Sequence, residues 1–321
     1  MTAFSPDQDG SVFCRLSQFG LIQVSGSDAA SFLQNLLSSD IRTLTPQHAQ
    51  LSSLNTAKGR MLASFLIWHS DGDYFLQLPA ALLAAIQKKL SLYVLRSQVN
   101  LSDASQSVVS FGIEGAAAVD ALSAVLELPL PVQDWQVSQQ AGLSVIRLGA
   151  QRFQLNAPAA RSEALWAQLA AELQPVAADH WDWLTVRAGI PVILPATQEQ
   201  FVPQMANLEL IGGGVSFKKG CYPGQEIVAR MQYLGKAKRR LYLAHVDPAD
   251  GQAAPQAGDT LFSTRSEEQA DGMIANVAAA PGGGYDLLGV IPIASREQGS
   301  LHLDSPQGTP LQFLPLPYAV P

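Results

Sequence analysis

Residues 213–230 read GGVSFKKGCYPGQEIVAR, and they are the most informative segment of the chain. Gly220 and the pair Pro223-Gly224 favour a tight turn around Cys221, because glycine and proline supply the backbone angles that turns need. Apolar residues at helical spacing follow this turn and predict a helix over 225–231. The cysteine is therefore expected at the N-terminus of a helix.

This setting gives Cys221 two interpretations. A thiol at a helix N-terminus faces free backbone N–H groups, and Lys218 and Lys219 add positive charge, which together favour the nucleophilic thiolate. Cys221 is then the catalytic group, with the two lysines beside it. The alternative is a buried and inert small side chain, which is the usual state of a free cysteine. Cys14 falls in an expected strand, and we interpret it as structural.

The same part of the chain is strongly basic. Residues 216–240 carry a net charge of +6, with Glu226 as their single carboxylate, whereas the whole chain carries −7. Screening confines such a field to about 10 Å, so the segment is either a local anion site or a solvated face of a loop and strand. The chain is not a general binder of polyanions. The basic residues are Lys218, Lys219, Arg230, Lys236, Lys238, Arg239 and Arg240.

Composition sets the class of protein. The chain has 321 residues, 47% of them hydrophobic and 15% charged, which predicts a folded protein of two or three domains with large cores. Its 2 cysteines exclude a disulfide scaffold, and its 5 scattered histidines predict no metal site. No apolar run is long enough to span a membrane. We expect a cytoplasmic protein that makes no contact with membranes.

Periodicity predicts an α+β fold. Strands over 61–68 and 74–78 flank Asp71-Gly72, a strong hairpin signal, and Pro79 is placed to begin the following helix. Short strands broken by glycine and proline follow residue 240 without helical spacing, which predicts a small antiparallel β-barrel.

The predicted domains follow from this pattern. They are an N-terminal α+β region (1–105), a second α+β domain (106–178), a segment that contains the cysteine motif (179–240), and the C-terminal barrel (241–321).

The motif around Cys221 also carries a resemblance. Residues 218–226, KKGCYPGQE, resemble the K-G-C-Y-x-G-Q-E signature of the YgfZ-type folate-binding proteins, which are relatives of the T-protein (aminomethyltransferase) of the glycine cleavage system. The resemblance covers most of the chain and includes residues 21–29, 32–34, 58–60, 188–191, 201–204, 207–208, 235–236 and 238–240.

Membership of this family implies a three-domain ring around a central hole and binding of tetrahydrofolate or a derivative. It also implies that the N-terminal region 1–105 binds folate and that the segment 179–240 returns to the central site. It also implies a role in maintaining iron–sulfur enzymes, one type of which thiomethylates tRNA. The partners would be folate, iron–sulfur proteins or their assembly factors, and tRNA indirectly.

The chain departs from the T-protein pattern in two ways. Ala63 and Ser64 align with its two carboxylates, one of them catalytic, so aminomethyl transfer by that mechanism is improbable. Arg187 stands where relatives often carry glutamate, and arginine cannot accept hydrogen bonds from a pterin. Whether the chain is an enzyme is therefore left open.

The resemblance also suggests residues for folate. Trp181 and Phe19 match positions where the family uses tryptophan, and both offer a stacking face. The amides of Gln204 and Asn207 are able to hydrogen-bond the edge of a pterin ring. Lys58 or Arg60 is suited to the glutamyl carboxylates. The alternative for each aromatic residue is a place in the core, and for Lys58 and its neighbour a hairpin turn.

The sequence is therefore compatible with three functions. The leading hypothesis is a tetrahydrofolate-binding accessory protein for iron–sulfur cluster assembly or repair, and through it for tRNA modification, with Cys221 as the working thiol. One cysteine cannot hold a cluster alone, so contact with a cluster would be shared with a partner. The alternatives are a folate-dependent one-carbon transferase, and a tRNA-binding module formed by residues 216–240.

Overall fold

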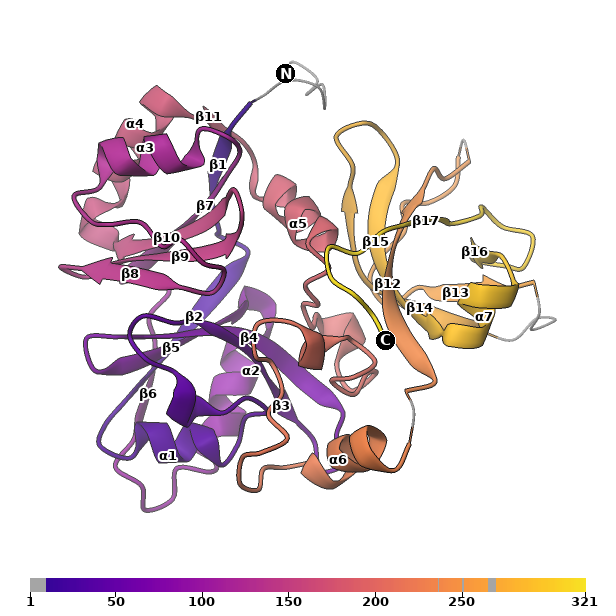
Figure 1. The fold of residues 1–321 in the computed structure, drawn as a ribbon, viewed down its shortest axis with the longest axis horizontal. Helices are drawn as coiled ribbons and strands as arrows, with labels where there is room; N and C mark the ends of the chain where they lie inside the picture. Colours follow the sequence, from indigo (N-terminus) through magenta and orange to yellow (C-terminus); the bar gives the residue numbers. More distant parts are fainter. Residues whose placement is uncertain (1–9, 236, 250, 265–269) are drawn as a thin grey trace. The chain divides into compact units, whose positions relative to one another are not determined.

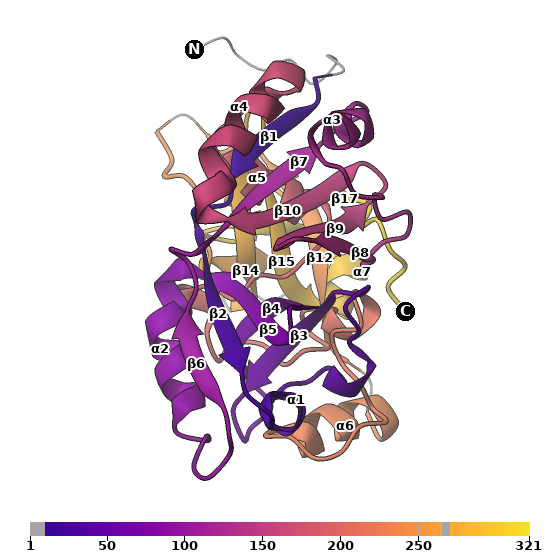
Figure 2. The ribbon, with the colours of Figure 1, turned by 90° about the vertical axis from the view of Figure 1, so that its left-hand side faces the viewer.

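The computed structural model describes residues 10–235, 237–249, 251–264 and 270–321 (Figures 1 and 2). Lys236, one of the predicted basic residues, lies outside them. The chain divides into two compact units. Among the described residues, unit 1 contains 53–64 and 182–321, and unit 2 contains 10–52 and 65–181. The predicted domain boundaries and the three-domain ring remain predictions.

Unit 2 contains a six-stranded sheet, which we call sheet A. Its strand order is β11-β1-β7-β10-β9-β8, antiparallel except for the β1–β11 pair. Helices α3 and α4 supply apolar side chains to the core with this sheet, among them Leu122 of α3 and Leu165 and Leu169 of α4. The elements are β1 (Val12–Arg15), β7 (Val108–Glu114), α3 (Ala118–Val125), β8 (Val137–Gln140), β9 (Leu143–Gly149), β10 (Arg152–Pro158), the 3₁₀ turn Ala159–Arg161, α4 (Ser162–Glu172) and β11 (Gln174–Pro175).

A five-stranded sheet, sheet B, has the order β3-β4-β5-β2-β6. Residues 53–55 of β3 and 61–64 of β4 belong to unit 1, and the rest of the sheet belongs to unit 2. Helix α2 packs against β2, β5 and β6. The elements are β2 (Phe19–Ser25), α1 (Ala29–Gln34), the 3₁₀ turn Ile41–Thr43, β3 (Gln50–Asn55), β4 (Met61–Ser70), β5 (Asp73–Pro79), α2 (Ala80–Ser91) and β6 (Asn100–Asp103).

Buried polar side chains link the two sheets within unit 2. Gln77 of β5 and Gln154 of β10 exchange hydrogen bonds, with Gln154 Nε2 lying 2.5 Å from Gln77 Oε1. Gln154 also donates to Asn156 Oδ1, which accepts from Ser110. Buried amides are stable only when paired, so this network holds the two sheets in one register.

Unit 1 carries the C-terminal sheet. Six strands in the order β16-β13-β14-β15-β12-β17 form a curled antiparallel sheet around their own apolar core (Figure 1). This half-barrel agrees with the predicted α+β class and with the expected C-terminal strands, but the short helix α7 was not expected there. The elements are β12 (Arg239–Val246), β13 (Thr260–Ser263), β14 (Ala270–Ala279), β15 (Tyr285–Pro292), α7 (Ile293–Gln298), β16 (Leu301–Leu303) and β17 (Gln312–Leu314).

The remaining part of unit 1 is mostly loop. It contains the turn between β3 and β4, most of α5 (Ala178–Arg187), the 3₁₀ turns Pro195–Thr197 and Leu208–Leu210, and α6 (Gln225–Tyr233). Helix α6 confirms the helix predicted after Cys221. Within the described parts of the chain, none of the helices is long and apolar enough to cross a membrane.

Candidate functional site

The turn before α6 separates two neighbouring side chains. Cys221 is exposed, whereas Tyr222 is buried, and burial raises the pKa of the Tyr222 hydroxyl to about 12. Gln225 holds the turn, because its side-chain oxygen accepts a hydrogen bond from the backbone N–H of Tyr222 at 3.1 Å. Lys219 lies over the Tyr222 ring, with Nζ 5.2 Å from the ring centroid. The tyrosine therefore anchors the turn and leaves the thiol accessible to solvent.

Gly224 brings two distant motifs of unit 1 together. It has φ +79° at the N-cap of α6, and a Cβ there would lie 2.6 Å from the Cα atom of Gly59. Ile227 packs against Gly59 from the first turn of the helix. The Lys58-Gly59 pair thus closes the hairpin between β3 and β4, and the same hairpin supports the start of α6. Only glycine allows this approach of two backbones.

Arg60 is the other candidate cation of this hairpin. Its backbone N–H donates to Thr56 Oγ1 at 3.2 Å, and its guanidinium group donates to the carbonyl of Gln200. Lys58 is exposed on the hairpin turn. Binding of folate carboxylates by Lys58 or Arg60 stays a prediction, and for Arg60 a ligand would have to compete with the Gln200 carbonyl.

The amides of Gln204 and Asn207 have internal partners. Gln204 Nε2 donates to the carbonyl of Val228 in α6 at 2.7 Å, and Asn207 Nδ2 donates to the carbonyl of Leu241 in β12 at 2.9 Å. Both residues are at most 1% exposed. In this structure the two amides fix α6 and β12, so contact between them and a pterin stays a prediction.

Arg240 is also buried and is not part of a basic surface. Its guanidinium group donates to the carbonyl of Gln204 at 2.9 Å and forms an ion pair with Glu209. Burial raises the pKa of the Glu209 carboxyl, and Arg240 partly offsets that effect. The prediction that Arg240 contributes to an anion site is therefore wrong, because its charge is neutralised inside unit 1.

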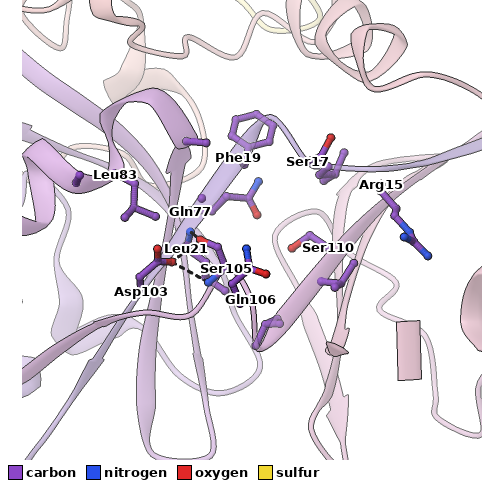
Figure 3. Close-up of a pocket in the computed structure, with 16 residues that line it drawn as sticks. Arg15, Ser17, Phe19, Leu21, Gln77, Leu83, Asp103, Ser105, Gln106 and Ser110 are labelled. Atoms are coloured by element: carbon purple, nitrogen blue, oxygen red, sulfur yellow. Dashed lines mark hydrogen bonds between the residues drawn. The ribbon is translucent and has the colours of Figure 1, made fainter. Parts of the chain in front are cut away.

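Phe19 lines a cavity of about 550 Å³ in unit 2 (Figure 3). The cavity lies where β2, β5, β6 and α2 meet β1 and β7. Its apolar wall includes Leu21 and Leu83, and its polar wall includes Gln77 and Ser110. The complete lining is Arg15, Leu16, Ser17, Phe19, Gly20, Leu21, Gln77, Ala80, Leu83, Ala84, Asp103, Ser105, Gln106, Val108, Val109 and Ser110.

Asp103 supplies the carboxylate of this cavity. Ser105 holds it in place, because the Ser105 backbone N–H and hydroxyl both donate to Asp103 Oδ1, at 2.9 and 2.5 Å. Arg15 supplies a cation, and its guanidinium group bonds Glu163 at 2.7 Å and lies 5.0 Å from the Trp166 ring centroid. Asp103 and Ser105 were not predicted from the sequence, since a single acidic residue at the end of a short polar strand and the serine that follows it carry no distinctive pattern.

Trp181 is placed differently from Phe19. It is 3% exposed, and the Arg152 guanidinium carbon lies 4.1 Å from its ring centroid. A Cβ on Gly112 would lie 2.6 Å from Trp181 Cδ2, so strand β7 runs directly against the indole. The residues lining the cavity do not include Trp181. Contact between Trp181 and folate stays a prediction.

The three residues that depart from the T-protein pattern are buried or paired. Ala63 is fully buried, and Ser64 Oγ accepts a hydrogen bond from the backbone N–H of Ile193 at 3.0 Å. Arg187 Nη1 lies 3.6 Å from Asp286 Oδ2. Among the described residues, no group of three or more histidine, cysteine, aspartate or glutamate side chains is arranged to hold a metal ion.

Comparisons with known proteins agree with this description. Residues 9–210 match the family model described as the GCVT N-terminal domain. The chain is 32% identical over 248 residues to the "tRNA-modifying protein YgfZ" of Photorhabdus laumondii. This alignment covers 77% of this chain and 73% of that relative. The chain is 28% identical over 308 residues to the protein of the same name in Escherichia coli O7:K1, covering 95% and 92%.

A solved structure shows the same fold. The glycine cleavage system aminomethyltransferase T of Bartonella henselae matches with a TM-score of 0.75 at 18% identity, covering 97% of this chain and 87% of that chain. This match confirms the predicted aminomethyltransferase type of fold. Because the family model spans more than half of the chain and the first relative is 32% identical, the chain belongs to the YgfZ family and contains the GCVT N-terminal domain.

Proposed function

We propose that this protein binds tetrahydrofolate in the cavity of unit 2 and supports iron–sulfur enzymes that modify tRNA. It would act in the cytoplasm, with Cys221 of unit 1 as its working thiol. The relatives named tRNA-modifying protein YgfZ support the link with tRNA modification. The folate site would lie in unit 2 and the thiol in unit 1, so substitutions in one unit test each site separately.

The observation that carries the proposal is the cavity lined by Phe19. Its volume of about 550 Å³ is in the range of small-molecule sites. Folate combines a flat heteroaromatic ring with two carboxylates, and the cavity offers an aromatic face, a carboxylate and a cation. Phe19 would stack on the ring, and Asp103 would accept hydrogen bonds from the donor edge of the pterin.

Arg15 is the cation of this cavity suited to the glutamyl tail. Its partner Glu163 has a side chain that is 81% exposed, and exposed ion pairs are weak. A folate carboxylate is therefore able to take the place of Glu163. The other candidate folate residues stay proposals. Trp181, Gln204 and Asn207 are buried. Gln204, Asn207 and Arg60 form hydrogen bonds within the protein. Lys58 is exposed on its turn.

The accessible thiol supports the second half of the proposal. Cys221 is exposed, so a partner protein is able to reach its sulfur without unfolding the turn. Lys218 and Lys219 stand next to it in the sequence. Since Ala63 and Ser64 provide no carboxylate, we do not assign aminomethyl transfer to this site.

Folate binding is tested by titrating tetrahydrofolate into the full chain and following tryptophan fluorescence. Phe19→Leu removes the stacking face, so we expect the dissociation constant to rise about five- to tenfold. Asp103→Asn replaces a charged acceptor, and we expect a rise of about tenfold or more. The matched control is Tyr93→Leu, an exposed aromatic residue of unit 2 outside this cavity, which should leave affinity unchanged. Unchanged affinity in both cavity variants would remove folate from this cavity.

The role of the thiol is tested in cells that need this protein for tRNA thiomethylation. Cys221→Ala is expected to abolish complementation, measured as thiomethylated nucleoside content, whereas Cys14→Ala should complement. Both variants should retain the folate affinity of the wild type, because neither residue lines the cavity. Full complementation by Cys221→Ala would contradict the proposed role.

A further inference from the structure

The surface beside α6 contains five exposed residues and two half-buried ones, and we call it the α6 surface. The exposed residues are Lys218, Cys221, Arg230, Tyr233 and Leu234, and the half-buried ones are Phe217 and Lys219. All seven residues belong to unit 1. Tyr233 and Leu234 are 67% and 84% exposed, which makes them two of the few large apolar side chains that face solvent in the described chain. Neither contributes to the core of unit 1, so this exposure needs another explanation.

Tyr233 is braced rather than free. Its ring meets the Phe217 ring edge to face, with centroids 6.2 Å apart and an interplanar angle of 73°. An aromatic contact of this geometry holds the tyrosine in a defined orientation. Because Tyr233 is 67% exposed, most of the residue stays accessible to solvent, as does its neighbour Leu234. The result is an ordered apolar platform.

Cations surround this platform. Lys218 is exposed, and Arg230 lies one turn before Leu234 on α6. Arg230 is paired with Glu226 at 3.0 Å, but the two side chains are 64% and 81% exposed. Such an exposed pair contributes little, so the guanidinium group is able to exchange Glu226 for another anion. The positive charge of the surface is therefore available to a ligand.

We propose that the α6 surface binds an unpaired loop of RNA, with a base stacked on Tyr233 and phosphates on Lys218, Lys219 and Arg230. This inference rests on the proposed function, since it makes tRNA a direct partner of the same turn that carries Cys221. Aromatic platforms flanked by cations are how proteins hold unstacked bases without reading duplex sequence.

An acidic protein is a weaker match to the same surface. A stable protein interface buries about 800 Å² on each partner and has a central apolar cluster. The exposed side chains of Tyr233 and Leu234 and the half-buried ring of Phe217 provide only a small part of such an area. A single unstacked base needs one platform of this size, and its neighbouring phosphates meet the lysines.

The test measures binding of fluorescein-labelled unfractionated tRNA to the full chain by anisotropy. Tyr233→Ala should weaken binding at least fivefold, because stacking on one base is lost. Lys218→Ala combined with Lys219→Ala should weaken binding further at low salt. The matched control is Lys88→Ala with Lys89→Ala, a pair of adjacent lysines on α2 in unit 2, which should leave affinity unchanged.

Three further measurements distinguish RNA binding at this surface from a loss of affinity caused by damage to the fold. Three phosphate contacts predict a slope of about −2 for log affinity against log salt, and removal of both lysines should reduce it to about −0.7. Glu226→Gln should strengthen binding, because it frees Arg230 and removes a repelling charge. Blunt duplex RNA of the same length should bind less tightly than tRNA.

The outcomes separate this inference from the proposed function. Tetrahydrofolate titrations of the α6 variants should match the wild type, and Phe19→Leu should bind tRNA normally. Folate binding without tRNA binding would overturn the inference alone, and tRNA binding without folate binding would overturn the folate proposal alone. Equal tRNA affinity in wild type and Tyr233→Ala would also overturn the inference. A third contrary outcome is a protein that binds poly-L-glutamate through Lys218 and Lys219 but does not bind tRNA.

Discussion

At the scale of single residues, His245 connects three elements of unit 1. Its Nδ1 lies 2.7 Å from Asp286 Oδ1, and its Nε2 lies 3.3 Å from Asp247 Oδ1. Asp286 also accepts a hydrogen bond from Trp183 Nε1 at 2.7 Å and pairs with Arg187. Asp286 is 3% exposed, so the surrounding donors stabilise a carboxylate inside the unit. The cluster joins α5 to β12 and β15.

This cluster predicts a dependence of stability on pH. Burial lowers the pKa of His245, but the hydrogen bonds to Asp286 and Asp247 outweigh it, so the pKa is raised above the usual value. A raised pKa means that the folded state binds the proton more tightly than the unfolded chain does. The stabilisation is therefore complete below about pH 6.5 and is lost as pH rises through the folded-state pKa.

The measurement is the free energy of unfolding in urea between pH 5.5 and 8.5. Wild-type stability should decline over the upper part of this range, and His245→Gln should remove that decline. His48→Gln, a histidine of unit 2 outside the cluster, is the control and should behave as wild type. A His245→Gln curve parallel to the wild-type curve would show that the histidine is not the responsible group.

At the scale of elements, the start of α6 depends on one backbone contact. Gly224 at φ +79° lies against Thr56 and Gly59, whereas Gly220 in the same turn has no atoms near the position of a side chain. Gly224→Ala should lower the free energy of unfolding by about 2–4 kcal/mol, because it combines a left-handed alanine with a clash against backbone. Gly220→Ala should change it by no more than about 0.5 kcal/mol.

Urea unfolding of both variants at one pH tests this difference. A loss of similar size in Gly220→Ala would show that the turn as a whole, and not the contact with the hairpin, sets the stability of α6. Far-ultraviolet circular dichroism should show that both variants retain their secondary structure before unfolding.

Local signals explain which elements the sequence predicts. The hairpin at Asp71-Gly72 is found, with both residues at positive φ, and Pro79 is the N-cap of α2. Strand β3, by contrast, was missed, because its buried residues include serines. Ser52 is fully buried and bonds Ser39 at 2.8 Å, a partner that becomes visible only when the chain has folded. Polar residues satisfied by tertiary contacts lack the alternation that identifies a strand.

In the candidate site, too, only the features set by neighbouring residues could be predicted from the sequence. The turn and helix around Cys221 follow from glycine, proline and helical spacing, and the structure has both. The internal bonds of Gln204, Asn207 and Arg240 could not be predicted, because their partners lie 24 to 36 residues away in the sequence. The cavity of unit 2 likewise forms only where six elements meet.

At the scale of the whole molecule, unit 1 is discontinuous. Residues 53–64 complete it through hydrogen bonds to the segment after α5. Met61 N donates to Phe201 O and Glu199 N donates to Met61 O, both at 2.8 Å, and Gln198 Nε2 donates to Leu62 O at 2.7 Å. A fragment made of residues 182–321 would leave all these groups without partners, although it contains the entire C-terminal sheet.

We therefore expect the fragment 182–321 to unfold without a cooperative transition around α6. The measurement is amide hydrogen exchange, in which residues 198–230 of the fragment should exchange much faster than in the full chain. Strands β12 and β15 should keep more protection, because they share their own core. Equal protection of residues 198–230 in both proteins would show that the hairpin is dispensable.

The contact between Gly59 and Gly224 has a consequence for synthesis on the ribosome. The two glycines are 165 residues apart, so at ordinary elongation rates roughly 8 to 33 s pass between their appearance. During that interval the nascent hairpin has no helix to meet. The turn that presents the thiol thus acquires its shape only after nearly three quarters of the chain has been translated, which delays completion of this loop until most of the polypeptide has emerged.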